Sequence, residues 1–350
     1  MTSCADGSCQ VRDLSREEKR QAFNHNVDKA QETWKDLRND LLRVGDDFFA
    51  HVTDMTQVEG CLHDGWDELI HAAKVIPPDS SEHDRLVTLI ADLRELGPFV
   101  RRKKEASPAD DDGNNDEPAV MPNGQQLWTD LPYLAEQLQT FWMNESMELP
   151  VDERRSLAVM TAKLCASGIC SYDISPCALW LFKEALETDR PLTRSSSMDS
   201  MSDVDAEILP IADLLPACAE WLHYSNCKIA QFSANNCNPV GDGERLLCPG
   251  PLAAEAIVPQ HGFSLARWLF WRRRLGDLYL TGDEQVAKMA RVCFEAMATT
   301  GRSIGIEIPG ERRYLERVYD ALEKEVTNRG STVCVAVDDI EIDPAWAIED

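Results

Sequence analysis

Apolar side chains recur at alternating intervals of four and three residues along the first strongly patterned segment. They stand at Phe23, Val27, Ala30, Trp34, Leu37, Leu41, Val44 and Phe48. Such a heptad seam keeps one apolar stripe turned toward a neighbouring helix. The spacing predicts a long amphipathic helix over 23–48. We expect its seam to pack against the next two helices of a monomeric chain, with a homodimer through residues 23–48 as the alternative.

Apolar residues at helical spacing continue through most of the chain. The stripes cover 62–76, 86–96, 131–142, 157–164, 179–186, 211–222, 265–278, 286–297 and 315–326. Recurrence at three and four residues is typical of helices that bury one face. Pro77, Gly97 and Gly168 separate or end several of them, since proline and glycine interrupt helices. The pattern predicts an all-α fold, a multi-helix bundle.

Polar segments without any period divide this helical pattern. We expect residues 105–126 to be a flexible acidic linker, a loop at about 189–205 to be disordered because it is rich in serine, and residues 331–350 to be a frayed acidic tail. The division leaves an N-terminal helical region over 1–104, which contains the heptad-like first helix, and a C-terminal helical domain over 127–330.

The charge balance restricts the partners of the chain. A formal net charge of -26, from 61 acidic and 35 basic residues, repels nucleic acid and anionic membrane surfaces. No stretch approaches the roughly 20 apolar residues that a membrane-spanning helix needs. The N-terminus has no apolar signal segment, and the 12 cysteines are dispersed. We therefore expect a soluble cytoplasmic protein with reduced thiols, and the basic run at 101–104 makes nuclear import the alternative.

Four segments rich in aromatic residues carry a resemblance to known proteins. They are LWTDLPYL at 127–134, SPCALWLFKEALE at 175–187, CAEWLHY at 218–224 and GFSLARWLFWRRRL at 262–275. Over about 120–300 the chain resembles a fungal family of uncharacterised helical proteins, a domain of unknown function. The resemblance implies an all-α fold and a filamentous-fungal source, and it transfers no catalytic residue.

Two Glu-x-x-His pairs lie on predicted helices, Glu68 with His71 and Glu220 with His223. Residues three apart on a helix project side by side, and carboxylate-bridged di-iron bundles use two such pairs. A metal site is therefore one hypothesis. The alternative, which we favour, is that Glu68 is a solvated surface acid and His223 a hydrogen-bonded histidine at a helix boundary. No cofactor is predicted.

The predicted helix over 265–278 carries arginines beside tryptophans. Arg267, Trp268, Trp271 and Arg274 could form a patch that binds an anion or an acidic peptide. The favoured alternative is an amphipathic helix that buries its aromatic residues while its arginines pair with surface carboxylates.

No familiar catalytic signature marks the sequence. It has no Walker loop, GxGxxG turn, G-x-S-x-G elbow or HExxH helix, and no two of its cysteines have the short spacing of a zinc finger. We interpret the chain as a helical scaffold or protein-interaction protein with a protein partner. The alternative is a metal- or small-molecule-dependent enzyme with a site between helices.

Overall fold

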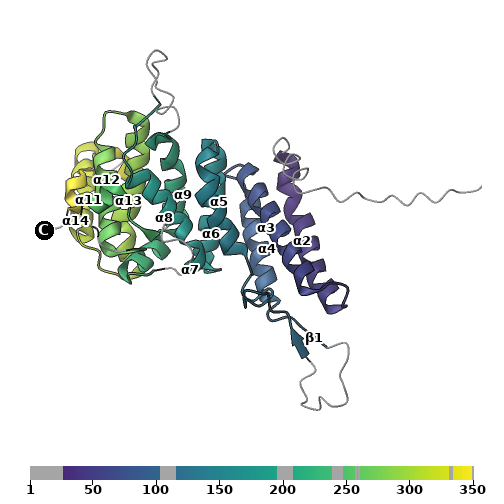
Figure 1. Ribbon diagram of the computed structural model, residues 1–350. Coiled ribbons are helices and arrows are strands. Elements are labelled where there is room, and N and C mark those ends of the chain that lie inside the picture. The colour runs from purple at the N-terminus through teal and green to yellow at the C-terminus, as the bar shows by residue number, and fades with distance from the viewer. Residues whose placement is uncertain are drawn as a thin grey trace, which may run out of the picture.

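Helices make up almost all of the regular structure. The computed structural model describes residues 27–102, 116–194, 208–238, 247–256, 258, 261–330 and 334–348. Its α-helices are α2 (Val27–Phe49), α3 (Met55–Val75), α4 (Glu82–Glu95), α5 (Leu134–Asn144), α6 (Val151–Ser167), α7 (Ser171–Ile174), α8 (Pro176–Leu186), α9 (Ile211–Ala234), α11 (Pro251–Glu255), α12 (Leu265–Tyr279), α13 (Glu284–Ile304) and α14 (Glu311–Arg329) (Figure 1). The all-α prediction is confirmed.

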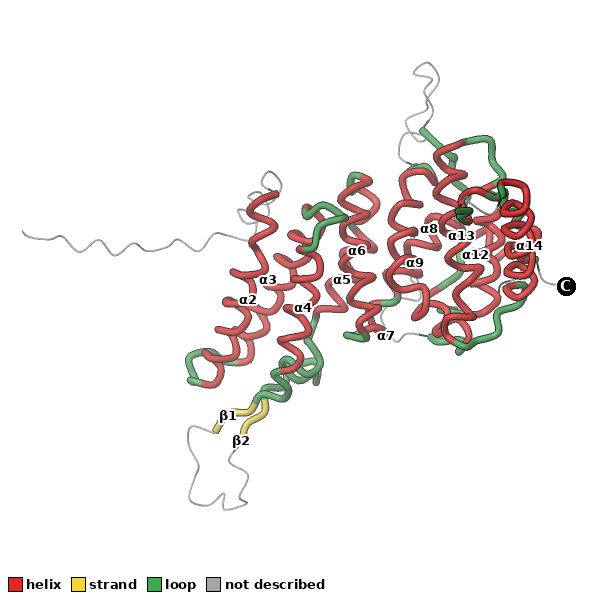
Figure 2. The backbone as a smooth tube through the Cα atoms, turned by 180° about the vertical axis from the view of Figure 1, so that it is seen from behind, coloured by secondary structure: helices red, strands yellow, loops and turns green. Residues whose placement is uncertain are grey.

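Pairs of consecutive helices stack side by side in two layers. Helices α4, α6, α9 and α13 contact one another in that order and form one layer, and α3, α5, α8 and α12 do the same in the second. Helix α2 covers α3 and α4 at one end of the row, and α14 packs on α13 at the other. The row is visible from both sides (Figures 1 and 2). This arrangement is that of helical-repeat proteins, in which each pair packs mainly on its neighbours.

The heptad seam of α2 packs within the chain. Leu37, Leu41, Val44 and Phe48 are buried, and α2 contacts both α3 and α4. The contact with α3 is close at Gly65, where a Cβ atom would lie 2.8 Å from Leu41 Cδ2. The predicted helix is confirmed over these residues, whereas Phe23 and the side chains of Val27 and Ala30 lie outside the described part.

Local sequence signals set several helix boundaries. Asp54 caps α3, and its side chain accepts a hydrogen bond from the Gln57 peptide nitrogen, which forms a capping box. Ser264 caps α12 in a similar way. At the other end of a helix, Gly168 follows α6 with a φ of 87°, a left-handed conformation that favours glycine. Among the described helices, none is long and apolar enough to cross a membrane.

The core runs without a break along the row of helices. Trp66, Trp142, Trp221, Trp268 and Trp271 are all completely buried in it. Side chains from both sides of the predicted linker take part. The indole of Trp66 on α3 donates to the carbonyl oxygen of Pro132 at 2.8 Å, which ties the N-terminal helices to the segment that enters α5.

Part of the segment expected to be a linker is ordered. Strand β1 (Val100–Arg102) pairs antiparallel with β2 (Asp116–Pro118), which projects from the row of helices (Figure 2). Arg101 donates to the carbonyl oxygens of Phe48 at 3.0 Å and Thr53 at 3.2 Å. Ala119 and Met121 are buried, so these two apolar residues anchor the end of an otherwise acidic segment. Residues 103–115 lie outside the described part.

The C-terminal tail also differs from the expectation. Residues 334–348 pack on the last helices instead of fraying, with Ile340, Ile342 and Ala347 buried. Arg272 donates to the carbonyl oxygen of Ala347 at 2.7 Å. Widely spaced apolar side chains, which form no helical stripe, anchor this acidic segment together with hydrogen bonds from Arg272 and Arg291. Of the predicted loop at about 189–205, residues 195–205 lie outside the described part.

Candidate functional site

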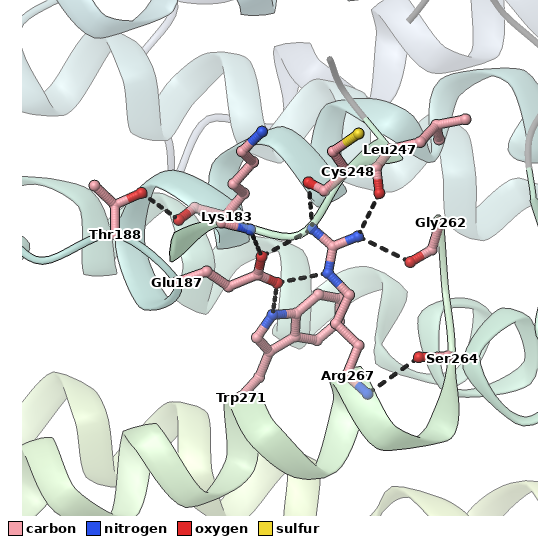
Figure 3. A network of polar contacts seen from close by, with 10 residues as sticks. Lys183, Glu187, Thr188, Leu247, Cys248, Gly262, Ser264, Arg267 and Trp271 are labelled. Atoms are coloured by element: carbon pink, nitrogen blue, oxygen red, sulfur yellow. Dashed lines mark hydrogen bonds and ion pairs between the residues drawn. The ribbon is translucent and has the colours of Figure 1, made fainter. Parts of the chain in front are cut away.

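A fully buried ion pair joins α8 to α12. Glu187 follows the last turn of α8, Arg267 lies in the first turn of α12, and neither side chain has exposed surface. Arg267 Nε lies 2.5 Å from Glu187 Oε1, and its Nη2 lies 3.0 Å from Oε2 (Figure 3). The indole of Trp271 also donates to Oε1 at 2.6 Å. Buried charges are costly unless paired and hydrogen-bonded, and this two-pronged contact meets that requirement.

The remaining Arg267 donors bind main-chain carbonyl oxygens. Nη1 donates to the carbonyl oxygens of Leu247 and Gly262, both at 2.9 Å. Nη2 donates to the carbonyl oxygen of Cys248 at 3.4 Å. One guanidinium therefore fixes two backbone segments that lie between α9 and α12, as Figure 3 shows.

Glu187 holds the same region from the other side. Its Oε2 accepts a hydrogen bond from the Gly250 nitrogen at 2.6 Å, and its own carbonyl oxygen accepts one from Leu252 at 2.8 Å. A Cβ atom at position 250 would lie 2.7 Å from Glu187 Cβ, so only glycine fits this close approach. Glu187, Arg267 and Trp271 form what we call the buried cluster.

The two backbone segments that Arg267 binds place a thiol beside an imidazole. Cys248 Sγ lies 3.4 Å from His261 Nδ1. The cysteine is half-buried and the histidine exposed, so both are reachable from solvent. The sequence alone does not indicate this pair, because the two residues lie 13 positions apart in segments without helical periodicity. The one available signal was a cysteine and a histidine that both border loop sequence rich in asparagine, glycine and proline.

Three of the four residues of the predicted binding patch are buried. Arg267, Trp268 and Trp271 have no exposed surface, and Arg274 is half-buried. The apolar face of α12 packs into the core, as the favoured alternative expected. Arg267 nevertheless pairs with the buried Glu187 and not with a surface carboxylate.

The structure does not bring the two Glu-x-x-His pairs together. On α3, Glu68 is half-buried and His71 is buried. On α9, Glu220 pairs with Arg155 at 2.6 Å, and His223 is exposed. Within the described ranges, no group of three or more histidines, cysteines, aspartates or glutamates could hold a metal ion. The hypothetical metal site requires all four side chains to converge on one point, and they do not.

Glu220 and His223 belong instead to a polar face that crosses α4, α6 and α9. We define this polar face as Asp79, Asp84, Arg155, Lys163, Glu220, His223 and Tyr224. In one row, Lys163 of α6 pairs with Asp84 of α4 at 2.6 Å, and its ammonium lies 4.8 Å from the ring centre of Tyr224 on α9. The rings of His223 and Tyr224 are in contact at 4.5 Å.

A second row runs parallel to the first. Arg155 of α6 contacts Asp79, which precedes α4, at 3.2 Å and Glu220 of α9 at 2.6 Å. Its guanidinium thus joins three successive segments, as Lys163 does in the first row. The two rows hold the exposed ends of polar side chains in fixed positions over the helices.

A cavity of about 430 Å³ lies at the junction between the end of α13 and the start of α14. Ile306, Ile308 and Leu315 provide part of an apolar wall. Arg302 and Tyr319, which are both exposed, also line the cavity, and the guanidinium donates to the tyrosine hydroxyl at 3.0 Å. The cavity has the size of a small-molecule site and both apolar and polar walls.

Comparison with known proteins gives the family. Residues 66–275, well over half of the chain, match the sequence profile of the family described as "Protein of unknown function (DUF3632)". The chain belongs to this family. The recognition of a domain of unknown function is confirmed, although the match begins within α3, earlier than the expected residue 120. The DUF3632 region contains the polar face and the buried cluster, whereas α2, α13, α14 and the cavity lie outside it.

One relative of the chain comes from Penicillium oxalicum. The "Oxopyrrolidines biosynthesis cluster protein G" of this fungus is 26% identical over 261 residues, which cover 72% of this chain and 69% of the relative. No solved structure matches the chain significantly. The comparisons thus give a fungal family of unknown function and a relative from a biosynthesis cluster.

Proposed function

We propose that the protein is a helical scaffold that binds a protein partner through the polar face. The observation that carries the proposal is the stacking of helix pairs in two layers, with one polar row after another crossing α4, α6 and α9. Arrays of this kind present long surfaces assembled from many helices, and helical-repeat proteins use such surfaces to bind other proteins.

The order of the polar face supports binding. Arg155 and Lys163 have side chains that are only 31% and 16% exposed, because neighbouring groups already hold them. A surface whose side chains are ordered before contact loses less conformational entropy on binding. Arginine and tyrosine are also enriched among the residues that contribute most to protein interfaces. Arg155 and Tyr224 are therefore the side chains we expect to contribute most.

The kind of partner follows from the relative in Penicillium oxalicum. Its name assigns that protein to an oxopyrrolidine biosynthesis cluster. We propose by extension that this chain also acts beside biosynthetic enzymes, as a non-catalytic partner of one of them.

The test compares variants of two surfaces in native cells. Tagged full-length protein is recovered by affinity purification as wild type, as the double variant K163E/Y224A, and as K324E. Lys324 is exposed on α14, away from the polar face and outside the cavity lining, and serves as the matched control. We expect wild type and K324E to retain the same biosynthetic enzyme and K163E/Y224A to lose it. Equal retention by all three proteins would contradict the proposal.

Small-molecule binding is a second candidate function, favoured by the cavity at α13 and α14. Its volume lies within the range of about 300–1,000 Å³ that is usual for ligand sites. Arg302 could pair with a carboxylate while the ligand's apolar part lies on Ile306 and Leu315. A thermal-shift screen with small organic acids tests this function. We expect a hit to raise the melting temperature of wild type and not that of R302A.

A further inference from the structure

Cys248 and His261 have the geometry of a nucleophile and its base. A sulfur-to-nitrogen distance of 3.4 Å is within reach of a hydrogen bond to sulfur, and Nδ1 can accept the thiol proton. An adjacent imidazolium stabilises the thiolate, which is the reactive form of cysteine. Because the histidine is exposed and the cysteine half-buried, a small electrophile can approach the sulfur from solvent.

The buried cluster holds both residues in place. Arg267 binds the carbonyl oxygens of Cys248 and of Gly262, the residue that follows His261. Gly262 has a φ of 72°, and a Cβ atom there would lie 2.8 Å from the carbonyl oxygen of Cys237. The backbone direction at His261 is thus fixed by a position that accepts only glycine. Reactive groups held by buried hydrogen bonds keep their geometry better than groups on loose loops.

We propose that Cys248 and His261 form a nucleophilic thiol site that adds to electron-poor alkenes conjugated to a carbonyl group. His261 Nδ1 takes the thiol proton, and the thiolate sulfur forms a bond to the β-carbon of the alkene. The π electrons move to the α-carbon, which takes a proton back from the imidazolium. The net reaction adds S–H across the double bond, so it needs no oxidant or other co-reactant.

Other cysteines provide internal comparisons. Cys334 is exposed, and Cys61 is exposed on α3. Burial, followed by the charge of Asp64, raises the pKa of the Cys61 thiol. Burial raises the pKa of Cys165 to about 11. On exposure alone, Cys334 would react faster than the half-buried Cys248, so a faster Cys248 requires an activating group.

The experiment labels the full-length protein with N-ethylmaleimide, an alkene of the proposed class. Peptide-resolved mass spectrometry then gives a separate rate for each cysteine. At pH 6.5 we expect Cys248 to react about tenfold faster than Cys334, because a free thiol with a pKa near 8.5 is almost entirely protonated there. The ratio should fall as the pH rises to 9, because ordinary exposed thiols become reactive thiolates over that range.

The variant H261N identifies the base. It should slow Cys248 to the rate of Cys334 or below while the labelling of Cys334 stays unchanged. A Cys248 rate in wild type that is no faster than that of Cys334 at pH 6.5 would overturn the proposal. So would fast labelling that persists in H261N. Because the wild-type pH profile is itself a test, the proposal stands or falls even if H261N does not fold, and independently of the scaffold function.

Discussion

The protein uses ion pairs in two opposite settings. Between α8 and α12, Glu187 and Arg267 are fully buried and have hydrogen-bond partners on every side. Across α4 and α6, Lys163 meets Asp84, whose side chain is 64% exposed. Breaking the first pair leaves an unpaired charge in the core, whereas breaking the second leaves Asp84 hydrated. An ion pair therefore stabilises the fold between α8 and α12, whereas an ion pair across α4 and α6 orders surface side chains.

Removal of the buried carboxylate should have the largest effect. E187A leaves Arg267 charged and unpaired in the core, which we expect to lower the free energy of unfolding by about 3–5 kcal/mol. Urea denaturation followed by circular dichroism measures the change. E316A, which removes a mostly exposed acid on α14, is the matched control and should cost less than about 1 kcal/mol. A loss no larger than that of the control would show that the buried cluster does not hold the fold.

A buried histidine beneath the polar face should make stability depend on pH. Burial, and then the charge of Lys163, lowers the pKa of His83 from 6.5 to about 4. Between these values the unfolded chain binds a proton that the folded chain does not, so stability falls as the pH drops from 6.5 to 4. The contribution lost is roughly 3 kcal/mol.

Urea midpoints measured from pH 7 to pH 4.5 test this dependence. The stability of wild type relative to that of H83L should fall steadily as the pH falls. A constant difference across the range would mean that His83 ionises equally in both states.

Substitutions at two glycines on α3 distinguish the effect of packing on stability from the effect of helix propensity. A Cβ atom at Gly65 would lie 2.8 Å from Leu41 Cδ2, so G65A should cost about 1–3 kcal/mol through overpacking. At Gly60 nothing lies within 4 Å of the added atom, and G60A should stabilise the protein by about 0.5–1 kcal/mol. Thermal melting of both variants gives the comparison. Shifts of the same sign would contradict the close contact between α2 and α3.

The smallest effect on stability belongs to the polar face. K163A should cost about 0–1 kcal/mol, because its partner Asp84 is well exposed and is hydrated when the pair is broken. Chemical denaturation in low and high salt measures it. A cost above about 2 kcal/mol would mean that the Lys163–Asp84 pair stabilises the fold in the way the buried cluster does.

The sequence was sufficient where local periodicity decides the structure. The stripe from Leu37 to Phe48 became a buried seam, and Gly168 ends α6 because its left-handed conformation suits glycine. The family resemblance also predicted the helical fold.

Contacts between distant residues could not be predicted in the same way. Glu187 and Arg267 lie 80 positions apart, and each alone looks like an ordinary surface charge on an amphipathic helix. Cys248 and His261 meet where Arg267 and a backbone hydrogen bond from Gly262 to Leu247 hold their segments together. The ordered tail likewise depends on contacts with α12 and neighbouring helices that its own composition does not reveal.

The central claim is that the polar face binds a protein partner. Lysine-directed crosslinking in native cells, followed by mass spectrometry of the recovered full-length protein, tests it most directly. We predict that crosslinks to another protein concentrate at Lys163 of the polar face and at Lys228, which lies one helical turn after Tyr224 on α9. They should be rare at Lys288 and Lys324, on α13 and α14. Crosslinks found mainly at Lys288 and Lys324 would contradict the account.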